Sequence, residues 1–251
     1  RFDLPSVTDL FSIKEAPDGT IHAVYSKTSI PCDPCDMGLY HGTLPMDGQW
    51  SEDLIQESKW GDPNDEYATD AALAIDSNGH PLIAATYFVR AITGSIKSAQ
   101  LRLYGSGQSG WCNETVVTEV DGYAGSDGTK MTGISPSIFM DTSDRPHVVF
   151  MDKAQWHDGN NWANAIDGQI RYAVRNGRKW TVRTLLTQDG QTKSPSPLIG
   201  ALPPSLAISP DGTSIHAATA TFEWDTDSIY LQQATDISFK ATAIQAESTL
   251  P

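Results

Sequence analysis

The side chains best suited to chemistry are aromatic and ionisable groups gathered in a few polar segments. Two segments combine tryptophan with acidic or imidazole groups: Asp152, Trp156, His157 and Trp162 in the first, and Glu223, Trp224 and Asp225 in the second. Two shorter sets pair a tyrosine with a cation: Tyr25 with Lys27, and Tyr87 with Arg90. Sugars offer an apolar CH face for stacking and hydroxyl groups for planar hydrogen-bonding partners. These residues are therefore predicted to bind a glycan.

The same segments contain the groups that glycan cleavage requires. A glycosidase places two carboxyl groups beside the scissile bond, and Glu223 with Asp152 could fill these roles. A lyase uses a base near a cation that neutralises the uronate, and His157 or Tyr87 with Arg90 could act in this way. These five residues are the catalytic candidates if the protein is an enzyme. The sequence has no GxSxG, HExxH or phosphate-loop motif.

The elements that must position these residues recur along the chain as an apolar strand, a polar turn and a second apolar strand. The four copies start at Ser12, Leu73, Ile138 and Leu206. An aromatic residue follows each turn, at Trp50, Trp111, Trp180 and Phe239. Turn residues cut each unit into four short strands without helical periodicity. This pattern predicts an all-β propeller with four four-stranded blades of about 64 residues each.

The expected organisation is a single propeller domain over residues 1–251, with blades at about 8–57, 70–119, 134–187 and 203–248. In a propeller, the turns after the first and third strands share one end of the sheets. The links between the second and third strands, and between blades, share the other end. The long connections all fall at this second end, and such connections are uncommon unless they serve function. We therefore expect the ligand there, whether four blades close alone or a homodimer or a missing segment supplies more.

Two pairs of segments resemble a known kind of blade. DSNGHPLIAA with QLRLYGSGQSGW, and DTSDRPHVVF with QIRYAVRNGRKW, resemble the BNR or Asp-box-like blades of sialidase-type propellers, propeller lectins, and glycan lyases or hydrolases. The resemblance covers about the whole chain and implies a propeller that binds or cleaves glycans. It is specific for the blade and not for an activity. Sialidase chemistry needs three arginines around the substrate carboxylate, and Arg90 is the only one expected in a loop of this end.

The tyrosine or tryptophan that recurs just beyond the second strand favours similar binding sites around the ring. The leading interpretation is therefore a secreted, carbohydrate-binding, lectin-like propeller. The first alternative is a carbohydrate-active enzyme, either a glycoside hydrolase or a polysaccharide lyase, and unequal loops between the second and third strands favour it. A protein-interaction or structural propeller is the second alternative. Whether the protein is an enzyme is left open.

Composition and short motifs limit the classes of binding partner and the cell location that are expected. The formal net charge of −14 repels phosphate backbones, so nucleic acid is not expected. No apolar stretch approaches the roughly 18 residues needed to cross a bilayer. The chain opens at Arg1 without methionine, so a processed or excised form is expected. Asn113 begins an Asn-Glu-Thr sequon, which predicts N-glycosylation of an extracellular protein.

The cysteines and histidines give weaker expectations. Cys32 and Cys35 are predicted to form a local disulfide, with Cys112 unpaired and buried. No metal site is predicted, because zinc would need two further ligands, and no cofactor is required. Calcium is an alternative at two acidic sets: Asp62, Asp65, Glu66 and Asp70, or Asp121 and Asp127. A repeated histidine is expected to complete fixed hydrogen bonds rather than to encircle a metal: His22, His147 and His216.

Overall fold

Short apolar runs separated by tight turns give this chain an all-β fold. The computed structural model describes residues 7–28, 37–58, 66–90, 96–107, 110–119, 129–156, 168–188, 198–201, 205–208, 214–225 and 228–240. The chain divides into two compact units, Arg1–Gly122 and Tyr123–Pro251, and each unit is treated separately below. The described residues contain no helix long and apolar enough to span a bilayer.

The first unit contains two antiparallel four-stranded sheets whose strands follow chain order. The first sheet consists of β1 (Val7–Glu15), β2 (Ile21–Thr28), β3 (Met37–Leu44) and β4 (Ser51–Ser58). The second consists of β5 (Glu66–Ile75), β6 (Pro81–Arg90), β7 (Ile96–Gly107) and β8 (Gly110–Glu119). Sequential antiparallel strands with short connections are the arrangement expected of propeller blades.

The second unit repeats this arrangement with one irregularity. Its first sheet consists of β9 (Thr129–Met140), β10 (Pro146–Trp156), β11 (Gly168–Asn176) and β12 (Lys179–Gln188). Its second consists of β13 (Leu198–Ala201), β14 (Ser205–Ile208), β15 (Ser214–Asp225) and β16 (Ser228–Lys240). Both β13 and β14 pair with β15, as two pieces of one interrupted strand. Pro203 and Pro204 fall between the pieces in the sequence, and proline has no N–H to donate to the ladder.

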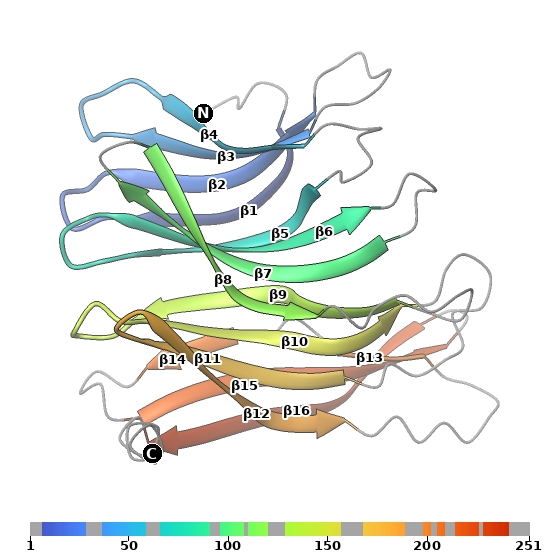
Figure 1. Cartoon of the computed structure of the whole chain (residues 1–251). Helices are drawn as coiled ribbons and strands as arrows, with labels where there is room; N and C mark the ends of the chain where they lie inside the picture. Colours follow the sequence, from blue (N-terminus) through green and yellow to red (C-terminus); the bar gives the residue numbers. More distant parts are fainter. Residues whose placement is uncertain are drawn as a thin grey trace. The chain divides into compact units, whose positions relative to one another are not determined.

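Each sheet has a hairpin end and a connection end, which Figure 1 shows within each unit. Tight turns join β1 to β2, β5 to β6 and β9 to β10 at the hairpin end. The links from β2 to β3, from β6 to β7 and from β10 to β11 leave from the connection end. Each unit therefore has its tight turns at one end of the sheets and its links between second and third strands at the other, as predicted from the sequence.

The three tight hairpins share one turn geometry. The amide of the fourth turn residue donates to the carbonyl of the first: Gly19 to Ala16, Gly79 to Asp76, and Asp144 to Asp141. That fourth residue has a positive φ of 83°, 85° and 55° in the three turns, a region that favours glycine. The Asp141 carboxylate also accepts the amides of Ser143 (2.8 Å) and Arg145 (2.9 Å). These internal hydrogen bonds fix the turn backbone, so the turns serve the scaffold.

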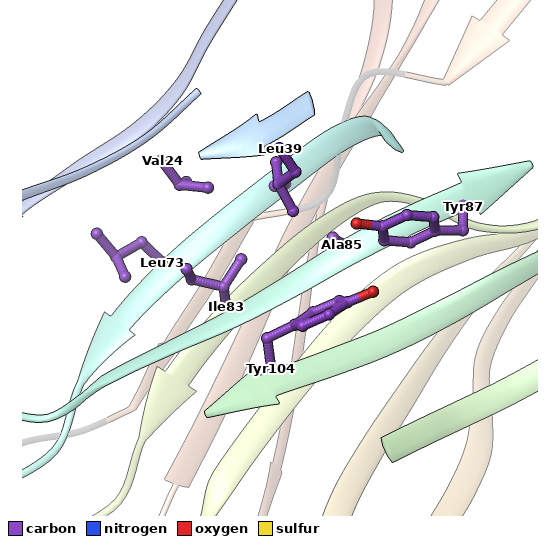
Figure 2. Packing of buried hydrophobic residues seen from close by; sticks show 8 residues of the cluster. Val24, Leu39, Leu73, Ile83, Ala85, Tyr87 and Tyr104 are labelled. Carbon is purple, nitrogen blue, oxygen red and sulfur yellow. The ribbon is translucent and has the colours of Figure 1, made fainter. Parts of the chain in front are cut away.

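The core of the first unit lies between its two sheets (Figure 2). Val24 and Leu39 of the first sheet pack against Leu73, Ile83 and the neighbouring apolar side chains of the second. Trp111, beside the β7–β8 turn, reaches the first sheet, where its ring meets the edge of His41 at a centroid distance of 5.0 Å. Trp111 therefore joins the two adjacent sheets of this unit. Trp50 instead covers its own sheet, because its ring occupies the space where a Cβ on Gly42 would lie.

The repeated histidines form hydrogen bonds in the two sheets where their side chains are described in detail. His22 Nδ1 lies 2.9 Å from His41 Nε2 in the first sheet. In the β9–β12 sheet, His147 Nδ1 lies 2.5 Å from the Tyr172 hydroxyl, and its Nε2 lies 3.2 Å from Asp141 Oδ2. The prediction that the repeated histidine completes fixed hydrogen bonds is therefore confirmed for His22 and His147.

Cys112 departs from the prediction. It is a free cysteine but is exposed rather than buried, because it lies on the outermost strand of its sheet, just after the β7–β8 turn. Cys32 and Cys35 lie outside the described residues, so their disulfide stays a prediction.

Candidate functional site

The predicted site residues fall on the second strand of each sheet or just beyond it. In the first unit, Tyr25 and Lys27 lie on β2, and Tyr87 and Arg90 lie on β6. In the second unit, two lie on β10 and three on β15: Asp152 and Trp156, and Glu223, Trp224 and Asp225. His157 and Trp162 lie outside the described residues. The backbone therefore places these strand residues toward the connection end of their own sheets.

In the first sheet, the Glu52 carboxylate of β4 contacts the polar groups of two other side chains. The Tyr25 hydroxyl donates to Glu52 Oε2 at 2.7 Å, and Lys27 forms an ion pair with Oε1. The Lys27 ammonium also lies 4.9 Å from the centre of the Tyr40 ring, and this ring stacks on Tyr25 at 6.0 Å. The result is a fixed carboxylate, cation and aromatic cluster on one sheet face.

Burial and hydrogen bonds shift the pKa of Tyr25 and of Glu52 in this cluster. Burial, reinforced by the hydrogen bond to Glu52, raises the pKa of Tyr25 well above its usual value. Partial burial works against ionisation of Glu52, but the hydrogen bonds from Lys27 and Tyr25 outweigh it and lower the pKa of Glu52. Glu52 is therefore a carboxylate at neutral pH and does not resemble a general acid, which needs a raised pKa.

In the second sheet, an arginine from β7 reaches across β6 to the start of β5. Arg102 Nη1 and Nη2 donate to the two carboxylate oxygens of Glu66 at 2.7 and 2.9 Å. Its Nε and Nη2 also donate to Gln100 Oε1 at 2.9 and 2.8 Å. The guanidinium carbon lies 4.8 Å from the centre of the Tyr87 ring. We call Glu66, Gln100 and Arg102 the arginine cluster.

Tyrosines form the buried layer next to the arginine cluster. The rings of Tyr87 and Tyr104 lie 5.8 Å apart, and their hydroxyl ends approach one another from β6 and β7 (Figure 2). Neither hydroxyl has a hydrogen-bond partner in the part of the chain that the structure describes. Burial raises the pKa of Tyr87 and of Tyr104. Burial opposes the charge on Arg102, yet the hydrogen bonds that Arg102 donates to Glu66 raise the pKa of Arg102 and keep it charged.

The structure corrects the expected use of two aromatic rings. Tyr25 and Tyr87 were predicted to stack against sugars, but both side chains are fully buried. Both faces of β2 and β6 are covered at these positions, because the residues next to Tyr25 and Tyr87 in sequence are buried too. Neither ring therefore presents a face to a ligand. Lys27 is mostly buried by its contacts with Tyr40 and Glu52.

The sequence predicts Glu66 only as a candidate calcium ligand and does not identify Glu52, Gln100 or Arg102. The signal for the last two was present in residues 100–104, where Gln100, Arg102 and Tyr104 alternate with Leu101 and Leu103. Such alternation places the polar side chains on one face of a strand. Site residues were expected in loops, whereas Gln100 and Arg102 lie on a strand, and Glu66 is 36 residues from Arg102 in sequence.

Among the described residues, no group of three or more His, Cys, Asp or Glu side chains is placed to hold a metal ion. Glu66, a member of one acidic set proposed for calcium, is engaged by Arg102. Asp62, Asp65, Asp121 and Asp127 lie outside the described residues. Asn113 is on the exposed outer strand β8, where a glycan would find room.

Comparison with known proteins gives likeness in fold alone. No protein-family model and no curated protein sequence matches the chain. A Penicillium chrysogenum α-L-arabinanase, solved with arabinobiose, matches with a TM-score of 0.54 and 12% identity, over 95% of this chain and 67% of the arabinanase. A GH93 α-L-arabinofuranosidase of Fusarium graminearum, also solved with arabinobiose, matches with a TM-score of 0.52 and 12% identity, over 94% of this chain and 68% of that enzyme. The α-L-arabinofuranosidase arb93a of Fusarium graminearum, solved with an iminosugar inhibitor, matches with a TM-score of 0.53 and 13% identity, over 95% of this chain and 67% of that enzyme.

These matches correct the leading functional interpretation. The sequence favoured a lectin without enzymatic activity, whereas the solved structures that the chain resembles are glycoside hydrolases. The recurring aromatic residues misled that inference, because two of them, Tyr25 and Tyr87, are core residues. The chain is an all-β protein of antiparallel four-stranded sheets, consistent with a propeller fold like that of these structures.

Proposed function

We propose that this protein is a glycoside hydrolase built on a β-propeller, with the reaction at the connection end of its sheets. The observation that carries the proposal is the fold likeness over 95% of the chain to an arabinanase solved with arabinobiose. Polysaccharides and oligosaccharides with arabinofuranosyl linkages are therefore the first substrate class. The β1–β4, β5–β8, β9–β12 and β13–β16 sheets would be four blades, with repeats of the Asp-box-like type.

The proposed catalytic carboxyl groups are those of Asp152 and Glu223. Each lies on the second strand of its sheet, at the connection end, and both strands belong to the second unit. Hydrolysis of a glycosidic bond needs one carboxyl group to protonate the leaving oxygen and another to act as base or nucleophile. The carboxylates of Glu52 and Asp141 are unsuited to the acid role, because their hydrogen bonds lower the pKa of each.

Several sequence predictions belong to the same proposal. They are secretion, glycosylation at Asn113, a Cys32–Cys35 disulfide, and glycan contacts from Lys27, Arg90, Trp156, His157, Trp162, Trp224 and Asp225. No cofactor is required by hydrolysis with two carboxyl groups, and calcium stays an alternative structural ligand. A homodimer stays an alternative source of further blades.

Incubation with arabinan, arabinobiose and a panel of other plant and fungal polysaccharides tests the proposal. We expect release of reducing sugar from at least one arabinofuranosyl substrate. Glu223→Gln and Asp152→Asn should each lower the turnover about 10²–10⁴-fold, the usual effect of removing one acid or base. Asp144→Asn is the matched control, since it removes one carboxylate from the hairpin end of the β9–β12 sheet.

The proposal fails if no polysaccharide in the panel is cleaved. It also fails in its residue assignment if both variants, folded by circular dichroism, retain the activity of the Asp144→Asn control.

A further inference from the structure

We propose that Gln100 and Glu66, held in place by Arg102, form a subsite for the hydroxyl groups of a neutral sugar. This inference rests on the proposed function and adds residues that neither the sequence motifs nor the similar structures assign. It concerns the first unit, whereas the proposed catalytic carboxyl groups lie in the second. Gln100 and Glu66 would contact sugar, and Arg102 would be a positioning residue.

The arginine cluster is rigid because one guanidinium fixes both other side chains. Arg102 makes four hydrogen bonds of 2.7–2.9 Å: one to each oxygen of Glu66, and two to Gln100 Oε1. A guanidinium is planar, so its two partners are constrained to lie around its edge. Its carbon lies 4.8 Å from the centre of the buried Tyr87 ring, which supports the group from one side. A ligand that meets groups already fixed in this way loses less conformational entropy on binding.

The orientation of the Gln100 amide follows from chemistry. Arginine is only a donor, so the atom facing Arg102 must be the amide oxygen. The amide nitrogen, with two N–H donors, is then directed away from the guanidinium. It has no hydrogen-bond partner in the described part of the chain.

Glu66 supplies acceptors beside this donor. Each of its oxygens accepts one N–H from Arg102, and a carboxylate oxygen has capacity for a second hydrogen bond. Its side chain is 33% exposed, whereas that of Arg102 is only 11% exposed. A ligand would therefore meet the carboxylate and the amide rather than the guanidinium.

A sugar hydroxyl both donates and accepts, so neighbouring hydroxyl groups fit a neighbouring donor and acceptor. Gln100 can donate to one hydroxyl while Glu66 accepts from another. The Arg102 charge is already balanced by Glu66, so the cluster offers no free cation to a uronate. The arrangement therefore selects a neutral sugar over an acidic one.

The position of the arginine cluster agrees with this role. Glu66 is the first residue of β5 and pairs with Val89, which directly precedes the end of β6 at Arg90. In the same ladders, Gln100 pairs with Tyr87 and Arg102 pairs with Ala85. The donor and acceptor thus lie toward the connection end of the β5–β8 sheet, from which the long connections of this unit leave. By contrast, the Arg145–Asp141 pair lies at a hairpin turn and serves the scaffold.

The test measures binding directly, so that it does not depend on catalysis. The side-chain amide signal of Gln100 is followed by NMR during titration with arabinobiose and longer linear arabino-oligosaccharides. We expect that signal to shift, and the shift to be absent with a uronic acid disaccharide. Gln100→Glu keeps the oxygen that Arg102 binds but removes the N–H donors, so it should weaken binding about tenfold.

Gln56→Glu is the matched control, because it introduces the same charge change on β4 of the same unit. Among the described residues, Gln56 donates a side-chain hydrogen bond to the neighbouring Glu57 carbonyl and to no other group. Its affinity should stay within about twofold of the parent protein. Arg102→Lys, which loses the planar fork, should weaken binding as Gln100→Glu does and raise KM more than it lowers kcat.

The outcomes separate this inference from the proposed function. Hydrolysis of arabinan together with an unmoved Gln100 signal and unchanged Gln100→Glu affinity would overturn the subsite and leave the enzyme. Binding that shifts the Gln100 signal without hydrolysis would support the subsite and overturn the enzyme. Absence of any binding to these oligosaccharides overturns the subsite as proposed.

Discussion

At the scale of single residues, the His22–His41 pair couples the first unit to pH. Their nitrogens lie 2.9 Å apart, and both side chains are buried. Burial, followed by the neighbouring His22, lowers the pKa of His41 from 6.5 to about 4. The pKa of His22 is also lowered, chiefly by burial. Both imidazoles are therefore neutral in the folded protein at neutral pH, and one can donate to the other.

The expected consequence is a loss of stability in mild acid. Between pH 6.5 and 4 the unfolded chain binds a proton at His41 that the folded chain does not, so the free energy of unfolding falls as the pH falls. A shift from 6.5 to about 4 corresponds to roughly 3 kcal/mol. The double variant His22→Leu/His41→Leu copies Leu82 and Leu103, the equivalent residues of the second sheet, and should reduce this dependence. Urea unfolding at pH 7 and pH 4.5 measures it, and equal pH dependence in both proteins would contradict the explanation.

The residue types of the site were easier to predict than their environment. Tyrosine beside lysine or arginine was recognisable at Tyr25 and Tyr87, but the sequence did not reveal that both rings are buried. Whether a strand face is covered depends on the neighbouring sheet, which no local pattern encodes. Likewise, Arg102 and Glu66 are brought together only by the pairing of β5, β6 and β7.

At the scale of elements, the hairpin turns depend on one backbone conformation. Gly79 has a φ of 85° and no heavy atom within 4 Å of the place where a Cβ would lie. Gly79→Ala should therefore cost about 1 kcal/mol through backbone strain alone. Gly105→Ala is the control, since Gly105 lies on β7 with equal room but without a positive φ. Thermal unfolding should show a lower Tm for Gly79→Ala only, and equal changes would contradict the backbone explanation.

The strands and their order could be predicted because turn chemistry and period-2 alternation are local. The repeat identified the hairpins of the first three sheets, which share the hydrogen bonds from Gly19, Gly79 and Asp144. The split of the first strand in the fourth sheet into β13 and β14 was not predicted. The two prolines predict a break in the strand, but the sequence does not show that pairing with β15 occurs on both sides of them.

At the scale of the whole molecule, equivalent positions differ in their exposure. Ile13 on β1 corresponds to Leu73 on β5, because each lies six residues before the turn glycine, Gly19 or Gly79. Leu73 is covered by the first sheet and is 1% exposed, whereas Ile13 is 53% exposed. Ile13→Thr should change the free energy of unfolding by less than about 0.5 kcal/mol. Leu73→Thr should cost about 3 kcal/mol.

Urea unfolding of the two variants, with dye binding to apolar surface, measures this difference. Ile13→Thr should also bind less of an apolar dye than the parent protein, because it removes exposed apolar area. If Ile13→Thr destabilises as strongly as Leu73→Thr, then Ile13 is covered in solution.

The antiparallel four-stranded sheets, which are consistent with a propeller, were predictable from the fourfold repeat, but the activity was not. A repeated blade describes the scaffold, while catalysis depends on the residues in which the blades differ. The solved structures that the chain resembles are glycoside hydrolases, and this likeness favours a hydrolase over a lectin. At 12% identity, the property that the chain shares with them is the fold.

The opposite placement of hairpins and long connections also has a practical consequence. A surface attachment, affinity tag or fused domain inserted at the exposed Ser77–Asn78 turn would project from the end of the sheet away from the arginine cluster. Exposed hairpin tips tolerate such insertions better than other positions do. The first unit could thus be immobilised in a chosen orientation, with the connection end of the β5–β8 sheet left free for any ligand.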